Sequence, residues 1–450
     1  MTVVDEVPVG PEARVYAEGW QSWSPTTWYA AGAHGLSPQH AWQHTMHFRP
    51  GTPVATSGLQ AEGVLVLDPA DGSPTRWYGA RSLTDVPTLH ATLTDGVVTI
   101  STDGAIASGT AGSGAAALSA VGASIAELGG GTVRQAPTVW CSWYRYFEAV
   151  TATDVAENLA ALAAHELPVE VVQIDDGWTD GLSLVPAPRF GDLPGLVSRV
   201  RDAGRRAGLW VAPFVVGTDT DLARAHPDWL VGDAGRNWDT DLRGLDLTHP
   251  GVRDHLRTEL SRLVGLGVDY LKLDFLYAGA VPGERLAGLT PVEAYRSGLA
   301  LVRETVGPQV YLVGCGAPLL PSIGLVDAMR TSSDVFHRGD EDGTRALRGL
   351  MAMTARTWQH GRWWSTDPDC LVARPAYAQR ERWAGAVRTY GGLRSVSDRV
   401  AELDAWGLTT TRDLLSDVVP PAPLPEATVE AGARLAASLV GQHRRLGDPP

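Results

Sequence analysis

From Val133 onward, short apolar runs alternate with amphipathic stretches of roughly 12 to 18 residues, which is typical of repeated βα units with a parallel sheet. Eight apolar runs have the length of a strand, and eight parallel strands separated by helices form a (β/α)8 TIM barrel. A ninth run, at 244–249, is interpreted as an extra element in a loop. The predicted strands are residues 138–143, 169–175, 209–216, 268–275, 310–316, 328–333, 362–366 and 392–397.

The segments on either side of this pattern differ from it. Short strand-like runs such as 63–69 and 96–102, broken by Gly, Pro, Ser and Thr, predict a small N-terminal antiparallel β domain. Residues 104–131 are rich in Ala, Gly and Ser and fit either a linker or an element packed on the domain junction. The expected organisation is an N-terminal β domain over 1–130, the barrel over 131–415, and a Pro-rich connector with a short C-terminal helix over 416–450.

Composition limits the partners and the compartment. The 37 basic and 51 acidic residues give a formal net charge of −14, which disfavours binding to nucleic acid or to an anionic membrane. The first residues show no basic segment followed by an apolar one, and no apolar stretch is long enough to span a bilayer, so we expect a cytoplasmic protein. Three cysteines, Cys141, Cys315 and Cys370, lack zinc-site spacing and are expected to be reduced thiols.

Two residue types depart from the usual usage. The chain has 16 tryptophans, and an indole face is a common stacking surface for a sugar, although large cores also use Trp as bulk. Lys272 is the sole lysine among 37 basic residues. Because Lys is a compact point charge and Arg a planar fork, this lysine within an apolar run indicates a crowded pocket that needs a cation beside a carboxylate.

Carboxylates follow several predicted strands at the end where barrel enzymes build their active sites. Lys272 and Asp274 share one strand face, so the ammonium is expected to keep Asp274 ionised, as a nucleophile needs, although a structural ion pair is the alternative. Asp175 and Asp176 cannot both point inward, so Asp176 is placed in the turn that Gly177 permits. The two carboxylates suit the binding of a sugar diol, or else a cap before a loop.

A second group of charges ends the sixth and seventh strands. Asp334 lies four residues beyond Arg330 and is expected to face Asp274 across the pocket. Two carboxyls about 5 to 5.5 Å apart across a sugar carry out retaining glycoside hydrolysis. The Arg330 charge favours the ionised form of Asp334, which opposes its use as an acid unless burial or Asp274 outweighs it. The segment from Asp367 to Asp369 fits a rigid turn and a substrate contact equally well.

These motifs together resemble the melibiase-type α-galactosidases of glycoside hydrolase family 36, which share a clan with family 27. The resemblance extends over about 131–400, and more weakly over Gly19–Ser24 in the β domain. Each motif alone is weak, and the order in which they occur makes the combination specific. In chain order they are WCSW (140–143), IDDGW (174–178), KLD (272–274), Cys315 in the fifth strand, R-x-x-x-D (330–334) and DPDC (367–370).

The resemblance implies an exo-acting, retaining α-glycosidase without cofactor or metal, most simply an α-galactosidase. It implies Asp274 as the nucleophile that forms a glycosyl-aspartate intermediate and Asp334 as the acid/base. Asp175 and Asp176 would bind the 4- and 6-hydroxyls, Lys272 the 3- and 4-hydroxyls, and Trp140 or Trp143 would line the sugar subsite. The candidate substrate-binding residues are Asp175, Asp176, Lys272, Arg330, Trp140, Trp143, Cys315, Trp178 and Asp367.

Several alternatives stay open at this point. The chain is shorter than is usual in family 36, and Ala317 stands where the family often has Gly beside the sugar 2-substituent, so an α-N-acetylgalactosaminidase is an alternative. A raffinose-synthase-like transglycosylase shares the barrel motifs, and a non-catalytic sugar-binding protein is a more remote alternative. A metal-dependent barrel enzyme would use Asp175, Asp176, Asp367 and Asp369 as ligands, but no His stands beside them. Sequence leaves the oligomeric state undetermined.

Overall fold

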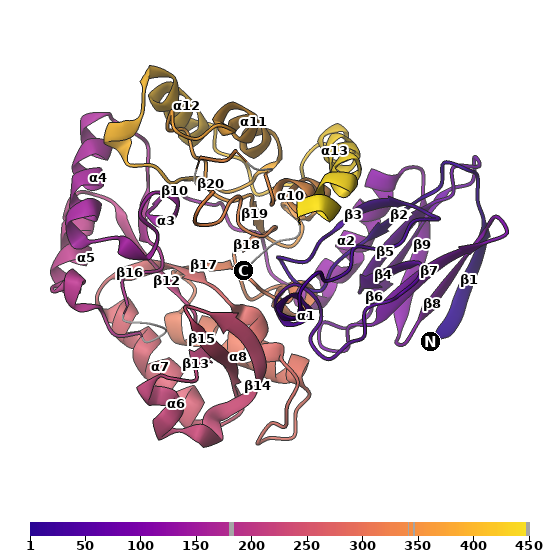
Figure 1. Cartoon of the computed structure of the whole chain (residues 1–450), viewed down its shortest axis with the longest axis horizontal. Helices are drawn as coiled ribbons and strands as arrows, with labels where there is room; N and C mark the ends of the chain where they lie inside the picture. Colours follow the sequence, from indigo (N-terminus) through magenta and orange to yellow (C-terminus); the bar gives the residue numbers. More distant parts are fainter. Residues whose placement is uncertain (180–183, 341, 345–346, 447–450) are drawn as a thin grey trace.

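The computed structural model shows a β domain packed against a (β/α)8 barrel, which confirms the predicted fold (Figure 1). It describes residues 1–179, 184–340, 342–344 and 347–446. The barrel strands follow one another in chain order, each parallel to the next. They are β10 (Thr138–Cys141), β11 (Val171–Ile174), β12 (Arg206–Val211), β16 (Val268–Leu273), β17 (Tyr311–Gly314), β18 (Ala328–Arg330), β19 (Ser365–Asp367) and β20 (Arg394–Val396).

The ring of strands closes between its first and last members. Strand β20 pairs with β10 in parallel, and the backbone N–H groups of Gly392 and Leu393 donate to the Thr366 carbonyl of β19, each at 2.9 Å. Each of the eight predicted strands overlaps one strand of the barrel, and the prediction 209–216 also runs into the separate strand β13 (Val215–Gly217). The run 244–249 lies outside the barrel as predicted, because strand β15 (Thr240–Leu245) pairs with β13 (Val215–Gly217) and β14 (Leu230–Asn237) in a small antiparallel sheet inserted after β12.

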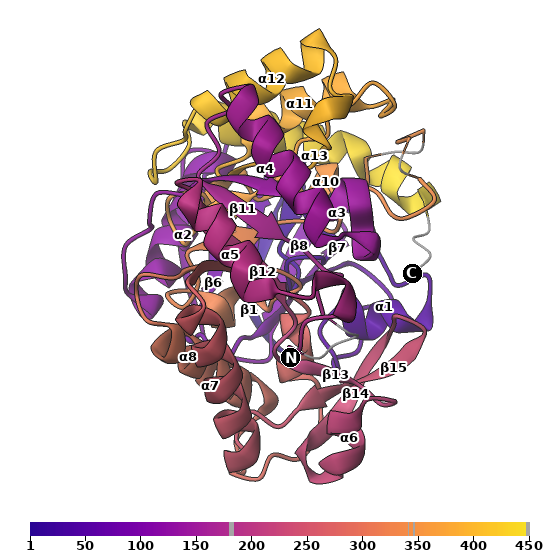
Figure 2. The ribbon, with the colours of Figure 1, turned by 90° about the vertical axis from the view of Figure 1, so that its left-hand side faces the viewer.

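Helices cover the outside of the barrel because the strand side chains alternate between its two faces. Val139, Val171 and Tyr270 pack inside the barrel, whereas Leu209 and Leu271 belong to the core beneath the helices. Helices α4 and α5 lie side by side on this outer surface (Figure 2). The helices that follow the barrel strands are α3 (Trp143–Tyr146), α4 (Ala152–Ala164), α5 (Leu193–Asp202), α6 (Asp221–Ala225), α7 (Pro250–Gly265), α8 (Pro291–Val306), α9 (Leu319–Ser322), α10 (Leu350–Ala355), α11 (Arg380–Tyr390) and α12 (Ala405–Ser416).

The β domain consists of two antiparallel sheets and two helices, α1 (Ala41–Met46) and α2 (Gly114–Gly129). The stretch 104–131 is no open linker, because it forms β9 and α2. A Cβ at Gly122 of α2 would lie 2.8 Å from the Trp358 ring, so the small residues of α2 allow close packing on the barrel. The strands are β1 (Thr2–Pro8), β2 (Arg14–Ala17), β3 (Thr27–Ala30), β4 (Leu59–Glu62), β5 (Val64–Asp68), β6 (Thr75–Ala80), β7 (Thr88–Thr94), β8 (Val97–Thr102) and β9 (Ile106–Ala111).

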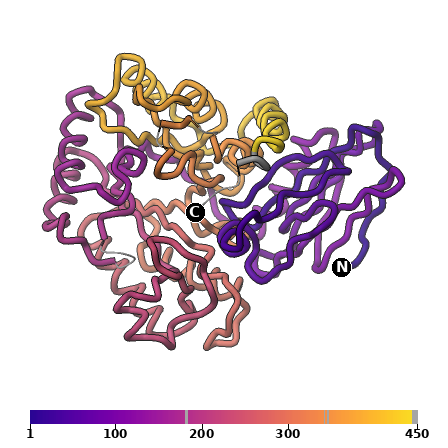
Figure 3. The backbone as a smooth tube through the Cα atoms, viewed as in Figure 1, coloured from indigo at the N-terminus to yellow at the C-terminus, as the bar shows by residue number. Residues whose placement is uncertain are grey.

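The carboxyl-terminal helix α13 (Glu426–Leu446) is longer than expected, with 21 residues. It packs against α10 of the barrel and β3 of the β domain, and so lies across the junction between them (Figure 3). Residues 447–450 of the expected segment lie outside the described residues. Of the helices that the structure describes, none combines the length and the apolar character needed to cross a membrane.

Candidate active site

Lys272 lies among carboxylates at the carboxyl ends of β11 and β16. Its Nζ is 3.0 Å from Asp175 Oδ2 and 3.7 Å from Asp274 Oδ2, and all three side chains are buried. This confirms that Lys272 and Asp274 share the inward face of the strand. Burial opposes the ammonium charge, but the Asp175 and Asp274 carboxylates outweigh it and raise the pKa of Lys272. Lys272 is therefore a cation at neutral pH.

The two neighbouring aspartates after β11 have different surroundings. Asp175 Oδ2 also accepts a hydrogen bond from Gln173 Nε2 at 2.6 Å, inside the barrel. Asp176 lies in the turn, where Gly177 has φ +109° and a Cβ would lie 2.7 Å from the Glu148 backbone, so only Gly fits there. Burial raises the pKa of Asp176 to about 6, although a hydrogen bond from the Trp238 indole opposes this shift.

Asp274 is held on both carboxylate oxygens. Oδ1 accepts from the backbone N–H of Phe275 at 2.8 Å, and Oδ2 accepts from Trp210 Nε1 at 3.0 Å. The Phe275 backbone is left-handed, with φ +51°, which ends the strand alternation at this point. These two donors and the nearby Lys272 ammonium fix the direction of the Asp274 carboxylate.

Asp334 is the more accessible carboxylate, with 28% of its side chain exposed. Its Oδ1 accepts from Arg330 Nη1 at 3.0 Å and its Oδ2 from Trp143 Nε1 at 3.2 Å. Burial raises the pKa of the Cys315 thiol, and the charges of Asp274 and Asp334 both add to this rise. Cys315 on the end of β17 therefore lies in the electric field of both carboxylates, between the strands that carry them.

Arg330 is bound by two further buried carboxylates. Its Nε is 3.3 Å from Asp367 Oδ2 and its Nη2 is 2.9 Å from Asp369 Oδ1. The Asp369 carboxylate also accepts from the Val335 N–H at 3.0 Å and from the Tyr144 hydroxyl. The segment 367–369 thus holds Arg330, and the Asp367 carboxylate is directed at that guanidinium.

Two of the predicted substrate contacts lie behind the site. Trp140 stands between the inward-facing Val139 and Cys141, so its ring points outward, and its indole donates to the Asp398 carbonyl at 2.9 Å. Trp178 has no exposed surface and donates to the Trp210 carbonyl at 2.7 Å. The structure therefore corrects both assignments, and of the two candidates Trp140 and Trp143 it is Trp143 that reaches the carboxylates.

Three tryptophans at the site were not selected from the sequence. Trp210 occupies the inner face of β12, a position that strand alternation in the predicted run 209–216 could have revealed. Trp238 comes from the turn between β14 and β15, and Trp23 comes from the β domain and packs on Phe275 with ring centroids 5.2 Å apart. No local signal connects these last two residues with the barrel strands.

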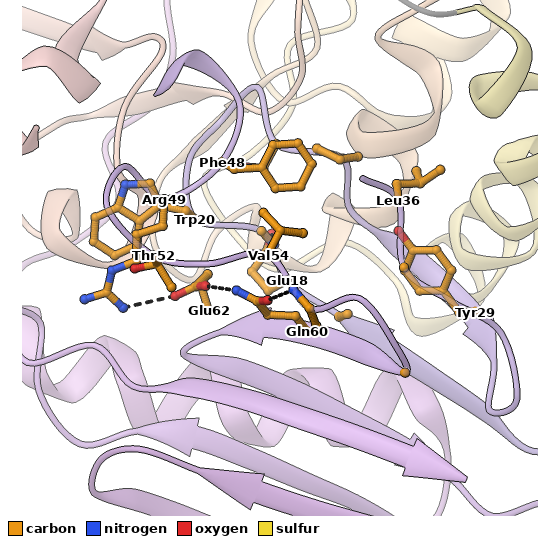
Figure 4. Close-up of a pocket in the computed structure, with 17 residues that line it drawn as sticks. Glu18, Trp20, Tyr29, Leu36, Phe48, Arg49, Thr52, Val54, Gln60 and Glu62 are labelled. Atoms are coloured by element: carbon orange, nitrogen blue, oxygen red, sulfur yellow. Dashed lines mark hydrogen bonds and ion pairs between the residues drawn. The ribbon is translucent and has the colours of Figure 1, made fainter. Parts of the chain in front are cut away.

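A separate pocket of about 50 Å³ lies within the β domain, under the loop that contains α1 (Figure 4). Arg49 and Glu62 point toward each other in it, 3.0 Å apart, and Gln60 donates to Glu62. Ligand pockets usually measure about 300 to 1,000 Å³, so this one is too small for a sugar. Its charged groups bind one another, and the carboxylates at the barrel end remain the candidate site.

Residues 133–278 match the melibiase family. Over 180 residues the chain is 30% identical to the bifunctional α-galactosidase/sucrose kinase AgaSK of Mediterraneibacter gnavus, an alignment that covers 34% of this chain and 18% of that protein. It is 33% identical over 147 residues to the α-galactosidase AgaA of Geobacillus stearothermophilus, covering 28% of this chain and 20% of that protein. The aligned part thus spans only about a fifth of these curated relatives.

The likeness in three dimensions extends over nearly the whole chain. The structure of TtGalA, an α-galactosidase of Thermus thermophilus in complex with p-nitrophenyl α-D-galactopyranoside, superposes with a TM-score of 0.77 at 27% identity. This superposition covers 93% of this chain and 89% of that one. Of the carboxylates at the barrel end, Asp175, Asp176 and Asp274 lie within the matched range 133–278, and Asp334, Asp367 and Asp369 lie beyond it.

Proposed function

We propose, from the premise that residues 133–278 are a melibiase domain related to the family 36 α-galactosidases, that this chain hydrolyses terminal α-galactosides with retention. The observation that carries the proposal is the arrangement of two carboxylates around Cys315. Asp274 lies beside the Lys272 ammonium, and Asp334 lies on the more open side beside Arg330. One carboxylate is thus buried beside a cation, and the other is accessible to a leaving group.

In the proposed reaction Asp274 attacks the anomeric carbon of an α-galactoside. Asp334 gives its proton to the glycosidic oxygen as that bond breaks, so the aglycone leaves as a neutral alcohol and a β-linked galactosyl ester of Asp274 remains. The Asp334 carboxylate then takes a proton from water, and the oxygen of that water attacks the same carbon and releases Asp274. Two inversions restore the α configuration in the product.

Sugar recognition is assigned to the charged groups next to the nucleophile. Asp176 and Lys272 present hydrogen-bonding atoms at the end of the barrel, and Asp175 fixes the lysine. The galactosides in the complexes of the Thermus relative, p-nitrophenyl α-D-galactopyranoside and stachyose, support galactose as the glycone. We place the enzyme in the cytoplasm, which its three free and buried cysteines fit.

Turnover of 4-nitrophenyl α-galactoside tests the activity. The wild-type chain should release nitrophenol, and Asp274→Ala should lower kcat/KM by at least about a thousandfold because the nucleophile is lost. Asp327→Asn is a suitable control, since Asp327 pairs with Arg134 and Arg303 at the opposite end of β18. Wild-type-like activity of Asp274→Ala would reject the nucleophile, and sugar binding without turnover by the wild type would favour a binding protein.

Product analysis tests the stereochemistry and the fate of the galactosyl group. Proton NMR during hydrolysis should show α-galactose first, and a β product would exclude the retaining mechanism. The 4-nitrophenyl glycoside of α-N-acetylgalactosamine should react more slowly than the galactoside. Transfer to added sucrose that exceeds hydrolysis would indicate a transglycosylase instead.

A further inference from the structure

Asp369 is connected to Asp334 by two independent routes, although it lies 35 positions further along the chain (369 − 334). Through its Oδ1 it accepts from Arg330 Nη2 at 2.9 Å, and the Nη1 of the same guanidinium donates to Asp334 Oδ1 at 3.0 Å. Through its Oδ2 it accepts from the backbone N–H of Val335, the residue that follows Asp334, at 3.0 Å. One buried carboxylate therefore binds both the charge partner of Asp334 and the backbone that follows it, where the Val335 N–H also donates to the Tyr144 hydroxyl at 3.1 Å.

The surroundings of Asp369 consist of hydrogen-bond donors. Arg330, the Val335 N–H, the Cys370 N–H at 2.7 Å and the Tyr144 hydroxyl all donate to it. Its side chain has no exposed surface, and its backbone has φ +87°, a conformation that is uncommon for residues other than Gly, Asn and Asp. Packing alone does not require a fully buried carboxylate that has this backbone conformation and accepts hydrogen bonds from four donors.

Arg330 favours the ionised form of Asp334, whereas an acid catalyst must carry a proton. The other charges around Arg330 reduce this conflict. When both are ionised, Asp367 and Asp369 carry two negative charges against the one positive charge of Arg330. The guanidinium is thus already neutralised from behind, and its pull toward an ionised Asp334 is weakened. The titratable and charged groups that face Asp369 are Arg330, Asp334, Asp367, Tyr144 and Tyr377.

We propose that Asp369 is a positioning residue that acts through Arg330 and the Val335 backbone to aim Asp334 at the glycosidic oxygen and to let it carry the catalytic proton. This inference rests on the proposed function, in which Asp334 is the acid/base. Burial raises the pKa of Asp369 to about 7, and Arg330 opposes that rise. The four donors favour the anion, so we expect Asp369 to act as a carboxylate above about pH 7.

Asp369→Asn tests the inference, because Asn keeps the shape, tolerates positive φ and removes the charge. With Arg330 less neutralised, Asp334 is expected to lose its proton at lower pH. The alkaline limb of the kcat/KM profile should then move down by about 0.5 to 1 pH unit. Methyl α-galactoside, whose leaving alcohol needs the proton, should lose about tenfold more activity than 4-nitrophenyl α-galactoside, whose leaving group does not.

Two controls separate this role from a structural one. Asp327→Asn also removes a carboxylate that is mostly buried and bound by arginines, and it should change neither the pH profile nor the ratio between the two substrates. Tyr144→Phe removes one hydrogen bond to Asp369 and leaves the carboxylate in place, so it should lower kcat for methyl α-galactoside and move the alkaline limb less than Asp369→Asn does. A limb that moves in Asp327→Asn, or that moves as far in Tyr144→Phe as in Asp369→Asn, would show that the shift is not specific to the charge of Asp369.

An unchanged alkaline limb in Asp369→Asn, with equal losses for both galactosides, would overturn the inference. If that variant does not fold, Asp367→Asn decides, because it removes the other carboxylate behind Arg330 and should move the limb in the same direction. An unchanged alkaline limb in Asp367→Asn would also overturn the inference. Failure of the wild type to hydrolyse either galactoside would instead contradict the proposed function.

Discussion

At the scale of single residues, tryptophan indoles hold the carboxylates of the site. Trp238 donates to Asp176, Trp210 to Asp274 and Trp143 to Asp334, at distances of 2.8 to 3.2 Å. An indole N–H is a neutral donor that cannot accept or titrate. It therefore fixes the direction of a carboxylate without cancelling its charge, as a guanidinium would. The high tryptophan content reflects this function as well as any stacking on sugar.

Trp210→Phe tests whether an indole donor supports the nucleophile. The ring volume is largely kept, but Asp274 Oδ2 loses a donor, so kcat should fall about ten- to a hundredfold while KM changes little. Steady-state kinetics with 4-nitrophenyl α-galactoside measure both constants. Trp363→Phe is the matched control, since its indole donates to the Gly122 carbonyl at the domain junction and should affect stability alone. An unchanged kcat in Trp210→Phe would show that the bond is dispensable.

Asp176 should make folding stability depend on pH in an unusual direction. The pKa of Asp176 is about 6 in the folded chain and near 4 in the unfolded chain. As the pH rises, the folded state therefore keeps the proton to a higher pH than the unfolded state does. Its contribution to stability is thus present below about pH 4 and is lost as the pH rises through about 6. Asp176→Asn should raise the free energy of unfolding by about 1 to 3 kcal/mol at about pH 7.5, and by almost nothing at about pH 4. Urea denaturation of both proteins at the two pH values measures this difference, and an equal gain at both would contradict the assignment.

At the scale of elements, those features of the fold can be predicted from the sequence that depend on residues close together in the chain. The barrel strands are identifiable because each apolar run is short and is bounded by turn residues, and Asp274 and Asp334 follow from their places after such runs. The hairpin of β14 and β15 is harder to predict, because the run 244–249, which begins at the end of β15, looks like a ninth barrel strand. The turn of this hairpin brings Trp238 to Asp176. The outward direction of Trp140 could have been predicted from strand alternation.

Helix α13 offers an element-scale prediction that contradicts helix propensity. Gly432→Ala would normally stabilise a helix, but a Cβ there would lie 2.5 Å from the Thr354 carbonyl of α10. We expect it to lower the free energy of unfolding by about 1 to 3 kcal/mol. Gly441→Ala on the same helix meets nothing within 4 Å and should stabilise the protein by up to about 1 kcal/mol. Thermal unfolding of both variants measures the contrast, and a gain in both would show that α13 does not pack on α10 as described.

At the scale of the whole molecule, the β domain and the barrel share one buried polar junction. Arg356 has no exposed surface, and its Nε donates to Glu18 Oε1 of the β domain at 2.9 Å. The same guanidinium donates to the carbonyls of Ser22 and of Thr331, the residue after Arg330. Sequence cannot predict this contact, because Glu18 and Arg356 are 338 positions apart and neither lies in a motif that indicates its partner. It places Trp23 against the end of the barrel.

Arg356→Met should therefore destabilise both parts of the molecule together. The substitution leaves Glu18 as an unpaired charge in the interior, which costs about 3 to 5 kcal/mol. Adding Glu18→Gln should recover part of the loss, because the remaining buried group is then neutral and still bonded by Tyr16 and Gln359. If the β domain and the barrel unfold as one unit, calorimetry will show a single transition that moves to lower temperature in Arg356→Met. Two resolved transitions, of which only one moves, would instead show that the β domain folds independently. The position of Trp23 would then depend on how the β domain docks on the barrel.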